Sequence, residues 1–259
     1  MEAASRIYWL QRTEADVPED GDWLTWSEKQ RLQTLLMPKR RRDWRLGRWT
    51  LKCAVSAFGR LVGCECPVQS VEVTVADSGA PCVFALGATL VVSLSHRAGT
   101  AIAAVAFSST AIGCDTELIE RRSEAFLTDY FTADEQALIS RSLNQAEIAF
   151  TTTLLWSAKE SVLKACQVGL RADLRDIHIL LSQDADRAAR FSSYVNPQEW
   201  RPYSVSTPEH RTLQGWWSHD GSFIRTIAGR SSTPPVHLDS DSFADTFRPR
   251  AVAISGTEP

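Results

Sequence analysis

The apolar residues of this chain change their spacing at Gly63, from a helical period to a strand-like one. Before Gly63, apolar residues at helical spacing lie on both sides of Pro38, which predicts two helices separated by the proline. After it, alternating residues in VQSVEVTVADSGAPCVF, ATLVVSLSH and TAIAAVAF predict strands, with a turn around Gly79. A helical segment followed by strands of this kind is typical of an α+β fold.

The same order occurs a second time. STAIGCDTELIE has a strand-like pattern, and FTADEQALISR is helical, with Thr132 and Glu135 at the spacing of a capping box. WSAKESVLKACQVGL predicts another helix, ending near Gly169. DIHILL, RPYSVSTPEH and TLQGWWSHDGSFIRTIAG then read as further strands. The seam lies near residues 107–109.

The repeated order predicts two α+β halves, residues 1–108 and 109–230, followed by a flexible tail at 231–259. The tail is rich in Ser, Pro and Asp and has no periodicity. No residue-level repeat is apparent, so the expected duplication depends on element order alone.

Composition excludes several classes of protein. With 259 residues and 44% hydrophobic content, the chain can bury the core of one large or two small domains. With a net charge of −3, the chain has no overall positive field that would attract nucleic acid or anionic membranes. It has neither a signal-like N-terminus nor an apolar run that could span a bilayer, so we expect a cytoplasmic protein that does not bind membranes. The six cysteines are expected to be reduced, structural thiols.

Two carboxylates lie two residues apart in AIGCDTELIE. On a strand, Asp115 and Glu117 would project from the same face, a donor arrangement that suits Mg²⁺. The alternative is an exposed polar strand face. Glu160 is the expected third carboxylate, and Lys159 and Lys164 together with a divalent ion would compensate the negative charge.

WSAKESVLK supplies that third carboxylate on a helix. Trp156, Glu160 and Lys164 are four residues apart and would share one face. A solvated helix face with an ordinary Glu–Lys pair is the competing interpretation.

Two further stretches could bind phosphate. Ser95 and His96 end an apolar strand, and His96 is either a satisfied surface group or a hydrogen-bond donor to phosphate. KRRRDWRLGR, residues 39–48, could be a solvated helix face, a short nucleic-acid patch or a phosphate clamp of arginines.

Four motifs in this order resemble the Sfp-type 4′-phosphopantetheinyl transferases: SGAPCV, SLSHRAGTAIAAVA, IGCDTE and WSAKESVLK. The resemblance spans roughly residues 40 to 170. Ala80 and Cys114 depart from the pattern, since many relatives have lysine and a branched aliphatic residue there. The resemblance implies two pseudo-symmetric α+β halves with the active site in the cleft between them.

The resemblance also implies an activity: Mg²⁺-dependent transfer of the phosphopantetheine arm of coenzyme A to a serine of an apo acyl or peptidyl carrier protein. Adenosine 3′,5′-bisphosphate would be released. The catalytic residues would then be Asp115, Glu160 and Lys164, and the metal ligands Asp115, Glu117 and Glu160. Glu160 would complete the metal site or act as general base. The residues expected to bind coenzyme A are Arg41, Arg48, Ser95, His96, Lys159 and Lys164.

Three alternatives remain open from the sequence. These are a non-catalytic module that binds coenzyme A or a carrier protein, a Mg²⁺-dependent nucleotide phosphohydrolase, and a nucleic-acid binder using residues 39–48. A site formed by two halves of one chain leads us to expect a monomer.

Overall fold

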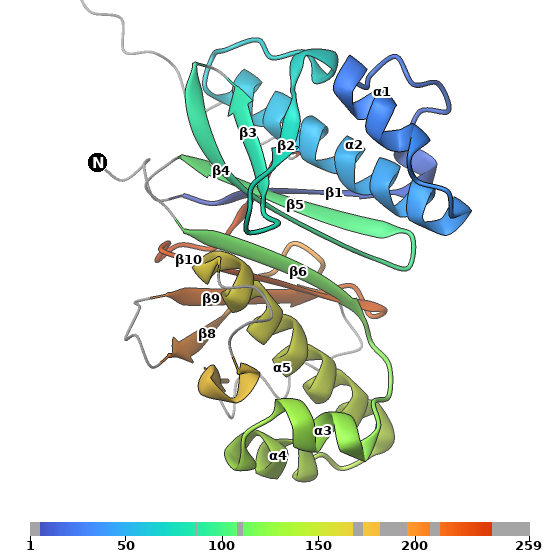
Figure 1. The fold of residues 1–259 in the computed structure, drawn as a ribbon. Coiled ribbons are helices and arrows are strands. Elements are labelled where there is room, and N and C mark those ends of the chain that lie inside the picture. The colour runs from blue at the N-terminus through green and yellow to red at the C-terminus, as the bar shows by residue number, and fades with distance from the viewer. Residues whose placement is uncertain are drawn as a thin grey trace, which may run out of the picture.

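The first half of the chain folds as a sheet covered by a long helix. The computed structural model describes residues 6–85, 87–107, 111–167, 173–181, 196–207 and 213–239. In the first half, the helices lie along one face of the strands (Figure 1). Its elements are β1 (Tyr8–Thr13), α1 (Trp26–Gln33), α2 (Pro38–Leu61), β2 (Val73–Val75), β3 (Pro81–Ala85), β4 (Ala88–Arg97) and β5 (Thr100–Phe107).

The second half has a sheet and a long helix of its own, and the fold as a whole is α+β with two sheets. Its elements are β6 (Ile112–Leu118), α3 (Glu124–Tyr130), α4 (Ala133–Ser140), α5 (Gln145–Cys166), β7 (His178–Leu180), β8 (Arg201–Ser206), β9 (Gln214–His219) and β10 (Phe223–Gly229). A last strand, β11 (Val236–His237), returns to the first sheet.

The two sheets repeat one strand order. From β1 the first sheet runs β1-β5-β4-β3-β2, and the second runs β6-β10-β9-β8-β7. Neighbouring strands within these two series are antiparallel. In each half the first strand is therefore followed by helices and then by four strands that lead back to it. The expectation of two halves with the same element order agrees with this topology.

The duplication of the two halves extends to single residues, contrary to the expectation that it depends on element order alone. Counted from the first residues of α2 and α5, Trp49 and Trp156 are both twelfth, and Lys52 and Lys159 are both fifteenth. The two stretches read WTLKCAV and WSAKESV. The similarity is short and interrupted, so it becomes visible only once the helices are placed in the same frame.

Each of these lysines makes the same buried ion pair. Lys52 Nζ lies 2.7 Å from Glu28 Oε2, and Lys159 Nζ lies 2.8 Å from Glu135 Oε2. Both lysine side chains are 0% exposed. Each glutamate is also the N3 residue of a capping box, at the start of α1 and of α4 respectively. In both halves, the glutamate that caps the short helix thus also pairs with a lysine of the long helix and links the two helices.

Three of the apolar clusters in the described residues pack against the two sheets. One lies between α2 and the first sheet, and includes Leu51, Phe58 and Val83. Another lies between α5 and the second sheet, and includes Leu155 and Trp217. A third joins the strands of both halves through Trp9, Ile102, Ala104, Ile112, Cys114, Trp216 and Ile227. Burying this third cluster packs the two sheets against each other.

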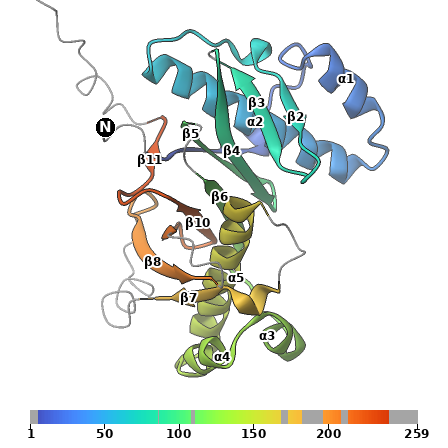
Figure 2. The same cartoon turned by 60° about the vertical axis from the view of Figure 1, so that its left-hand side comes forward.

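The C-terminal segment differs from the expected tail in its first residues. β11 pairs in parallel with β1, with Val236 opposite Tyr8 and His237 opposite Trp9 (Figure 2). Leu238 is 7% exposed and packs into the first cluster. Residues 236–238 therefore belong to the first sheet, since the Val236 and Leu238 N–H groups donate to the Ile7 and Trp9 carbonyls. The remainder of the predicted tail, 240–259, lies outside the described residues.

Other boundaries also differ from the sequence-based expectation. β1 and the short helix α3 were not predicted, and α5 begins at Gln145 rather than near Trp156. The Asn144 side chain accepts a hydrogen bond from the Glu147 N–H and caps this helix. The capping box at Thr132, the turn at Gly79 and the presence of two helices agree with the expectation, but Pro38 is the first residue of α2 and does not lie between the helices.

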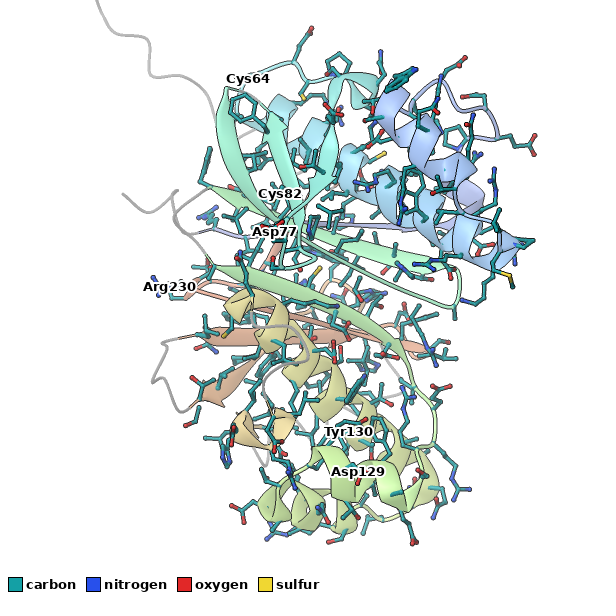
Figure 3. All side chains as sticks on the ribbon, in the orientation of Figure 1. Cys64, Asp77, Cys82, Asp129, Tyr130 and Arg230 are labelled. Atoms are coloured by element: carbon teal, nitrogen blue, oxygen red, sulfur yellow. The ribbon has the colours of Figure 1, made fainter. Side chains whose placement is uncertain are left out.

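None of the helices in the described part of the chain combines the length and apolar character that a membrane span requires. All six cysteines are free. Cys64 and Cys82 are exposed on the first half, whereas Tyr130 lies on α3 in the second (Figure 3).

Candidate active site

Asp115 lies at the point where β4, β6 and α5 meet. It is 4% exposed, and its Oδ1 accepts hydrogen bonds from Lys164 Nζ and Ser95 Oγ, both at 2.8 Å. Lys164 also donates to the Cys114 carbonyl oxygen at 3.1 Å. The other oxygen, Asp115 Oδ2, is buried and has no hydrogen-bond partner among the residues that the structure describes. A buried carboxylate oxygen without a partner is costly and indicates room for a further donor or a cation.

Gly113 allows α5 to approach β6 this closely. A Cβ atom at this position would lie 1.9 Å from the Ser161 carbonyl oxygen and 2.5 Å from the Ala165 nitrogen. Only a residue without a side chain permits such backbone contact. The close approach places Lys164 within reach of Asp115, two residues further along β6.

Glu160 is half-buried one turn before Lys164 on α5. Within the described residues its carboxylate makes no hydrogen bond or ion pair. Burial and the neighbouring charge of Asp115 raise the pKa of Glu160, while Lys164 acts in the opposite direction. The raised pKa means that Lys164 does not fully offset the effects of burial and of Asp115 on this carboxylate.

Glu117 is held from both sides. Its Oε1 accepts a hydrogen bond from Trp156 Nε1 at 3.2 Å, and its Oε2 accepts one from Arg122 Nη2 at 3.3 Å. Arg97 Nε lies 3.4 Å from the same Oε2 atom. Burial and Asp115 raise the pKa of Glu117, against the effect of Trp156 and the arginines.

The two arginines and Glu120, which also pairs with them, were not among the predicted site residues. The charged run ERR, residues 120–122, soon after the D-x-E motif, was the available signal for Glu120 and Arg122, whereas Arg97 follows directly after His96.

The groups around Lys164 favour its charged form. Burial disfavours its ammonium group, but Asp115, Cys114 and Glu160 outweigh that effect, and the pKa of Lys164 is raised. Its side chain is nevertheless 30% exposed. A cation that is held by a carboxylate and still reaches solvent is well suited to contact an anionic ligand.

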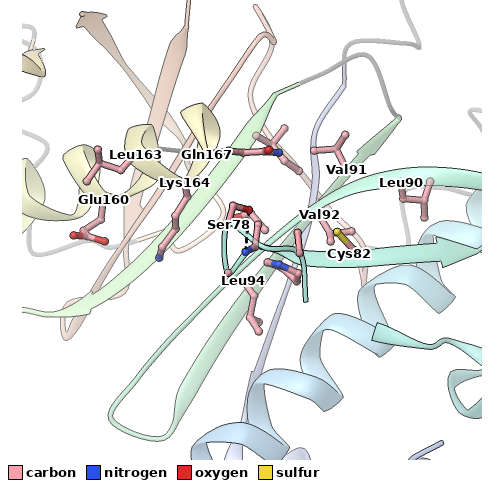
Figure 4. A pocket seen from close by; sticks show the side chains of 16 residues that line it. Ser78, Cys82, Leu90, Val91, Val92, Leu94, Glu160, Leu163, Lys164 and Gln167 are labelled. Atoms are coloured by element: carbon pink, nitrogen blue, oxygen red, sulfur yellow. Dashed lines mark hydrogen bonds between the residues drawn. The ribbon is translucent and has the colours of Figure 1, made fainter. Parts of the chain in front are cut away.

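Two pockets meet at Lys164. The first has a volume of about 390 Å³, and α5 contributes Glu160, Leu163, Lys164 and Gln167 to it (Figure 4). Its opposite wall consists of β4 residues, including Leu90, Val92 and Leu94, and of the turn around Gly79. The second has a volume of about 350 Å³. Both are lined by residues of the two halves.

The second pocket brings together four of the predicted coenzyme A-binding residues, Arg48, Ser95, His96 and Lys164. Arg48 Nη1 donates to the Val73 carbonyl at 2.7 Å, and its guanidinium lies over the Trp44 ring at 4.9 Å. Partial removal from water lowers the pKa of His96, which is therefore a neutral hydrogen-bonding group near pH 7.

Two predicted residues lie elsewhere. Lys159 is fully buried, pairs with Glu135 and donates to the Leu174 and Ile177 carbonyls at 2.8 Å, so its assignment to coenzyme A binding is not supported by this geometry. Arg41 donates to the Leu32 and Leu35 carbonyls at the end of α1 and lines neither of the two pockets.

Aligned positions of α2 and α5 differ at the predicted site residues. At the sixteenth and twentieth helix positions, α5 has Glu160 and Lys164, whereas α2 has Cys53 and Ala57. The buried lysine that pairs with a capping-box glutamate is present in both helices. The buried lysine and its tryptophan neighbour are thus common to both helices, whereas Glu160 and Lys164, which line the first pocket, occur only on α5.

The described residues of the protein offer few ligands for a metal ion at this site. No group of three or more His, Cys, Asp or Glu side chains that could hold a metal ion is present in the residues that the structure describes. The predicted trio of Asp115, Glu117 and Glu160 is thus not assembled in this conformation. Asp115 Oδ2, which has no hydrogen-bond partner among the described residues, and the incompletely compensated Glu160 still fit Mg²⁺. This ion commonly takes one or two carboxylates and completes its shell with water and substrate phosphate.

Comparison with known proteins points to one family for the second half. Residues 111–214 match the family model of the 4′-phosphopantetheinyl transferase superfamily. The matched segment includes β6 and α5 and covers less than half of the chain. No curated protein matches the chain. Among solved structures, Thermotoga maritima holo-[acyl-carrier-protein] synthase is 17% identical with a TM-score of 0.34, over 48% of this chain and 64% of that chain. The match therefore covers less than two thirds of that synthase.

Proposed function

We propose that this protein is an Sfp-type 4′-phosphopantetheinyl transferase that moves the phosphopantetheine arm of coenzyme A to a serine of an apo acyl or peptidyl carrier protein. The observation that carries the proposal is the position of Lys164. This cation is paired with Asp115, lies one turn from Glu160 and lines both pockets. The superfamily match over the same elements supports it.

The two pockets fit the two ends of coenzyme A. The phosphates of the nucleotide end would lie in the second pocket, where Arg48 and His96 provide donors. The first pocket has mainly apolar walls and would receive the pantetheine arm. The pyrophosphate between them would then lie beside Lys164.

The reaction needs one bond formed and one broken. The carrier serine oxygen attacks the phosphorus next to the pantetheine arm, and the bond from that phosphorus to the adenosine 3′,5′-bisphosphate oxygen breaks. Glu160 accepts the serine proton, for which its raised pKa makes it a better base than an ordinary glutamate. Lys164 remains protonated and neutralises charge on the departing phosphate.

Mg²⁺ would supply further neutralisation of the pyrophosphate charge when bound. Asp115 and Glu160 would hold it, with Glu117, whose contacts to the two arginines are long, as a third ligand. Ser95 orients Asp115 through the 2.8 Å hydrogen bond to Oδ1. Because both halves of one chain line the pockets, we propose that the monomer is active.

Intact-protein mass spectrometry tests the proposal. A panel of apo acyl and peptidyl carrier proteins is incubated with the protein, coenzyme A and Mg²⁺, with EDTA in a parallel sample. Gain of one phosphopantetheine mass, abolished by EDTA and by Glu160→Gln, is expected. Glu65→Gln serves as the matched control, since Glu65 is exposed and far along the chain from the site.

Other outcomes would reject the transferase. Binding of coenzyme A without any mass gain would favour a non-catalytic module. Loss of coenzyme A in the absence of a carrier protein would favour a phosphohydrolase.

A further inference from the structure

Four charged side chains form a closed set at the edge of the site. Arg97 ends β4 in the first half, and Glu117 lies on β6 in the second. Glu120 and Arg122 follow in the segment between β6 and α3. Both arginines contact both glutamates, so two positive charges are shared between two negative ones.

The distances show that the sharing is unequal. Arg97 Nη2 lies 2.5 Å from Glu120 Oε1, whereas Arg97 Nε lies 3.4 Å from Glu117 Oε2. Arg122 Nη1 lies 3.0 Å from Glu120 Oε1, whereas Arg122 Nη2 lies 3.3 Å from Glu117 Oε2. Each arginine is therefore closer to Glu120 than to Glu117.

The unequal sharing affects what Glu117 can bind. A carboxylate held by two guanidinium groups is a poor ligand for a cation, because the cation must approach two positive charges. Glu120 draws both arginines towards itself and leaves Glu117 only long contacts to them. Without Glu120, the same two arginines would have Glu117 as their nearest carboxylate.

We propose that Glu120 is a positioning residue that holds Arg97 and Arg122 and so keeps Glu117 available to a divalent cation. This inference rests on the proposed function in taking Glu117 as a metal ligand. It assigns to Glu120 a role in metal affinity and to the two arginines the role of competitors for the ligand.

Titration of the full-length protein with Mn²⁺ alone tests the inference, with free Mn²⁺ measured by electron paramagnetic resonance. Glu120→Gln is expected to weaken Mn²⁺ binding about tenfold, the effect of one poorly screened charge close to the ion. Arg97→Gln should bind Mn²⁺ at least as tightly as the wild type. The double variant Glu120→Gln/Arg97→Gln should return to within about threefold of the wild type.

Two variants separate positioning from general electrostatics and from folding. Asp173→Asn removes a carboxylate of an exposed ion pair with Arg175 in the same half, and should leave Mn²⁺ affinity unchanged. Glu120→Asp keeps the charge and should restore most of the affinity. Thermal unfolding of every variant identifies any that fails to fold.

An unchanged Mn²⁺ affinity in folded Glu120→Gln, or equal weakening in Asp173→Asn, would overturn the inference and leave the transferase proposal intact. So would a double variant that stays as weak as Glu120→Gln. A wild-type protein that transfers no phosphopantetheine in the mass-spectrometry assay would instead reject the proposed function, whatever Glu120 does.

Discussion

Gly113 on β6 lies directly against the backbone of Ser161 on α5, and a Cβ atom at Gly113 would be 1.9 Å from the Ser161 carbonyl oxygen. The contact sets the distance between the strand that carries Asp115 and the helix that carries Lys164. It also explains why a glycine precedes the acidic pair by two residues.

Gly113→Ala should force α5 away from β6. We expect a loss of roughly 1–3 kcal/mol in the free energy of unfolding, the range for overpacking in a well-packed core. The separation should also lengthen the Lys164–Asp115 contact and lower transfer activity. Denaturant unfolding checks the first effect. In Gly21→Ala the new Cβ meets its nearest atom only at 3.9 Å, so this control should change stability little.

Glu160→Gln should stabilise the metal-free protein while lowering transfer by roughly 10²–10⁴-fold, the usual contribution of a general base. The folded-state pKa of Glu160 is raised above its ordinary value of 4.5. Glu160 therefore contributes stability below that value, and the contribution is lost as the pH rises through the raised pKa.

Thermal unfolding between pH 4 and pH 8 measures this effect. The gap between variant and wild type should widen with pH, whereas Glu65→Gln should show no gap. A wild type that is more stable than Glu160→Gln at pH 8 without metal would contradict the prediction.

Lys159→Met should destabilise the protein by roughly 3–5 kcal/mol, because Glu135 would remain buried without its partner. Lys52→Met should produce a similar loss through Glu28. The double variant Lys159→Met/Glu135→Gln should recover most of the stability and bind coenzyme A normally by calorimetry. Weakened binding in the recovered variant would show that Lys159 does contact coenzyme A.

Lys164→Met should lower kcat by roughly 10²–10³-fold, since it removes a cation from the point where phosphate charge develops. The KM for coenzyme A should rise as well, because Lys164 lines both pockets. Steady-state transfer assays give the two parameters. Lys29→Met is the control: Lys29 is an exposed lysine on α1 that lies 3.7 Å from Asp22 and lines neither pocket, so its loss should change neither value.

Leu238→Ala should cost about 2 kcal/mol, the lower end for a buried leucine, because Leu238 packs beneath β11 in the first apolar cluster. Leu36→Ala, at a leucine that is 88% exposed, should change the unfolding free energy by less than about 0.5 kcal/mol. Equal effects of the two substitutions would mean that Leu238, directly after β11, does not contribute to stability.

Local signals in the sequence predicted the elements that carry the site. Thr132 and Glu135 predicted a cap, and alternating residues predicted β4, β5 and β6. β1 and β11 were not predicted, because their pairing joins residues more than 200 positions apart and no local pattern encodes it. The spacing of Trp156, Glu160 and Lys164 predicted a shared face, but it could not show that Lys159 points into the core.

The charged residues around Glu117 illustrate the same limit. Arg97 and Glu120 are 23 positions apart and belong to different halves, so their ion pair depends on how the two sheets pack. The D-x-E spacing predicted that Asp115 and Glu117 share a strand face, yet it could not predict that Trp156 and two arginines would hold Glu117.

The common strand order of the halves has a consequence for how such a site can be built. The acidic strand and its helix come from one half, whereas β4 and Arg48 come from the other, and the acidic pair has no counterpart on β1. A chain with a single half could present both surfaces only by associating with a second copy of itself, and every copy would then have to carry both sets of residues. Joining two halves in one chain frees each half to specialise, so that one carries the acidic residues and the other carries Arg48 and the β4 wall of the pockets.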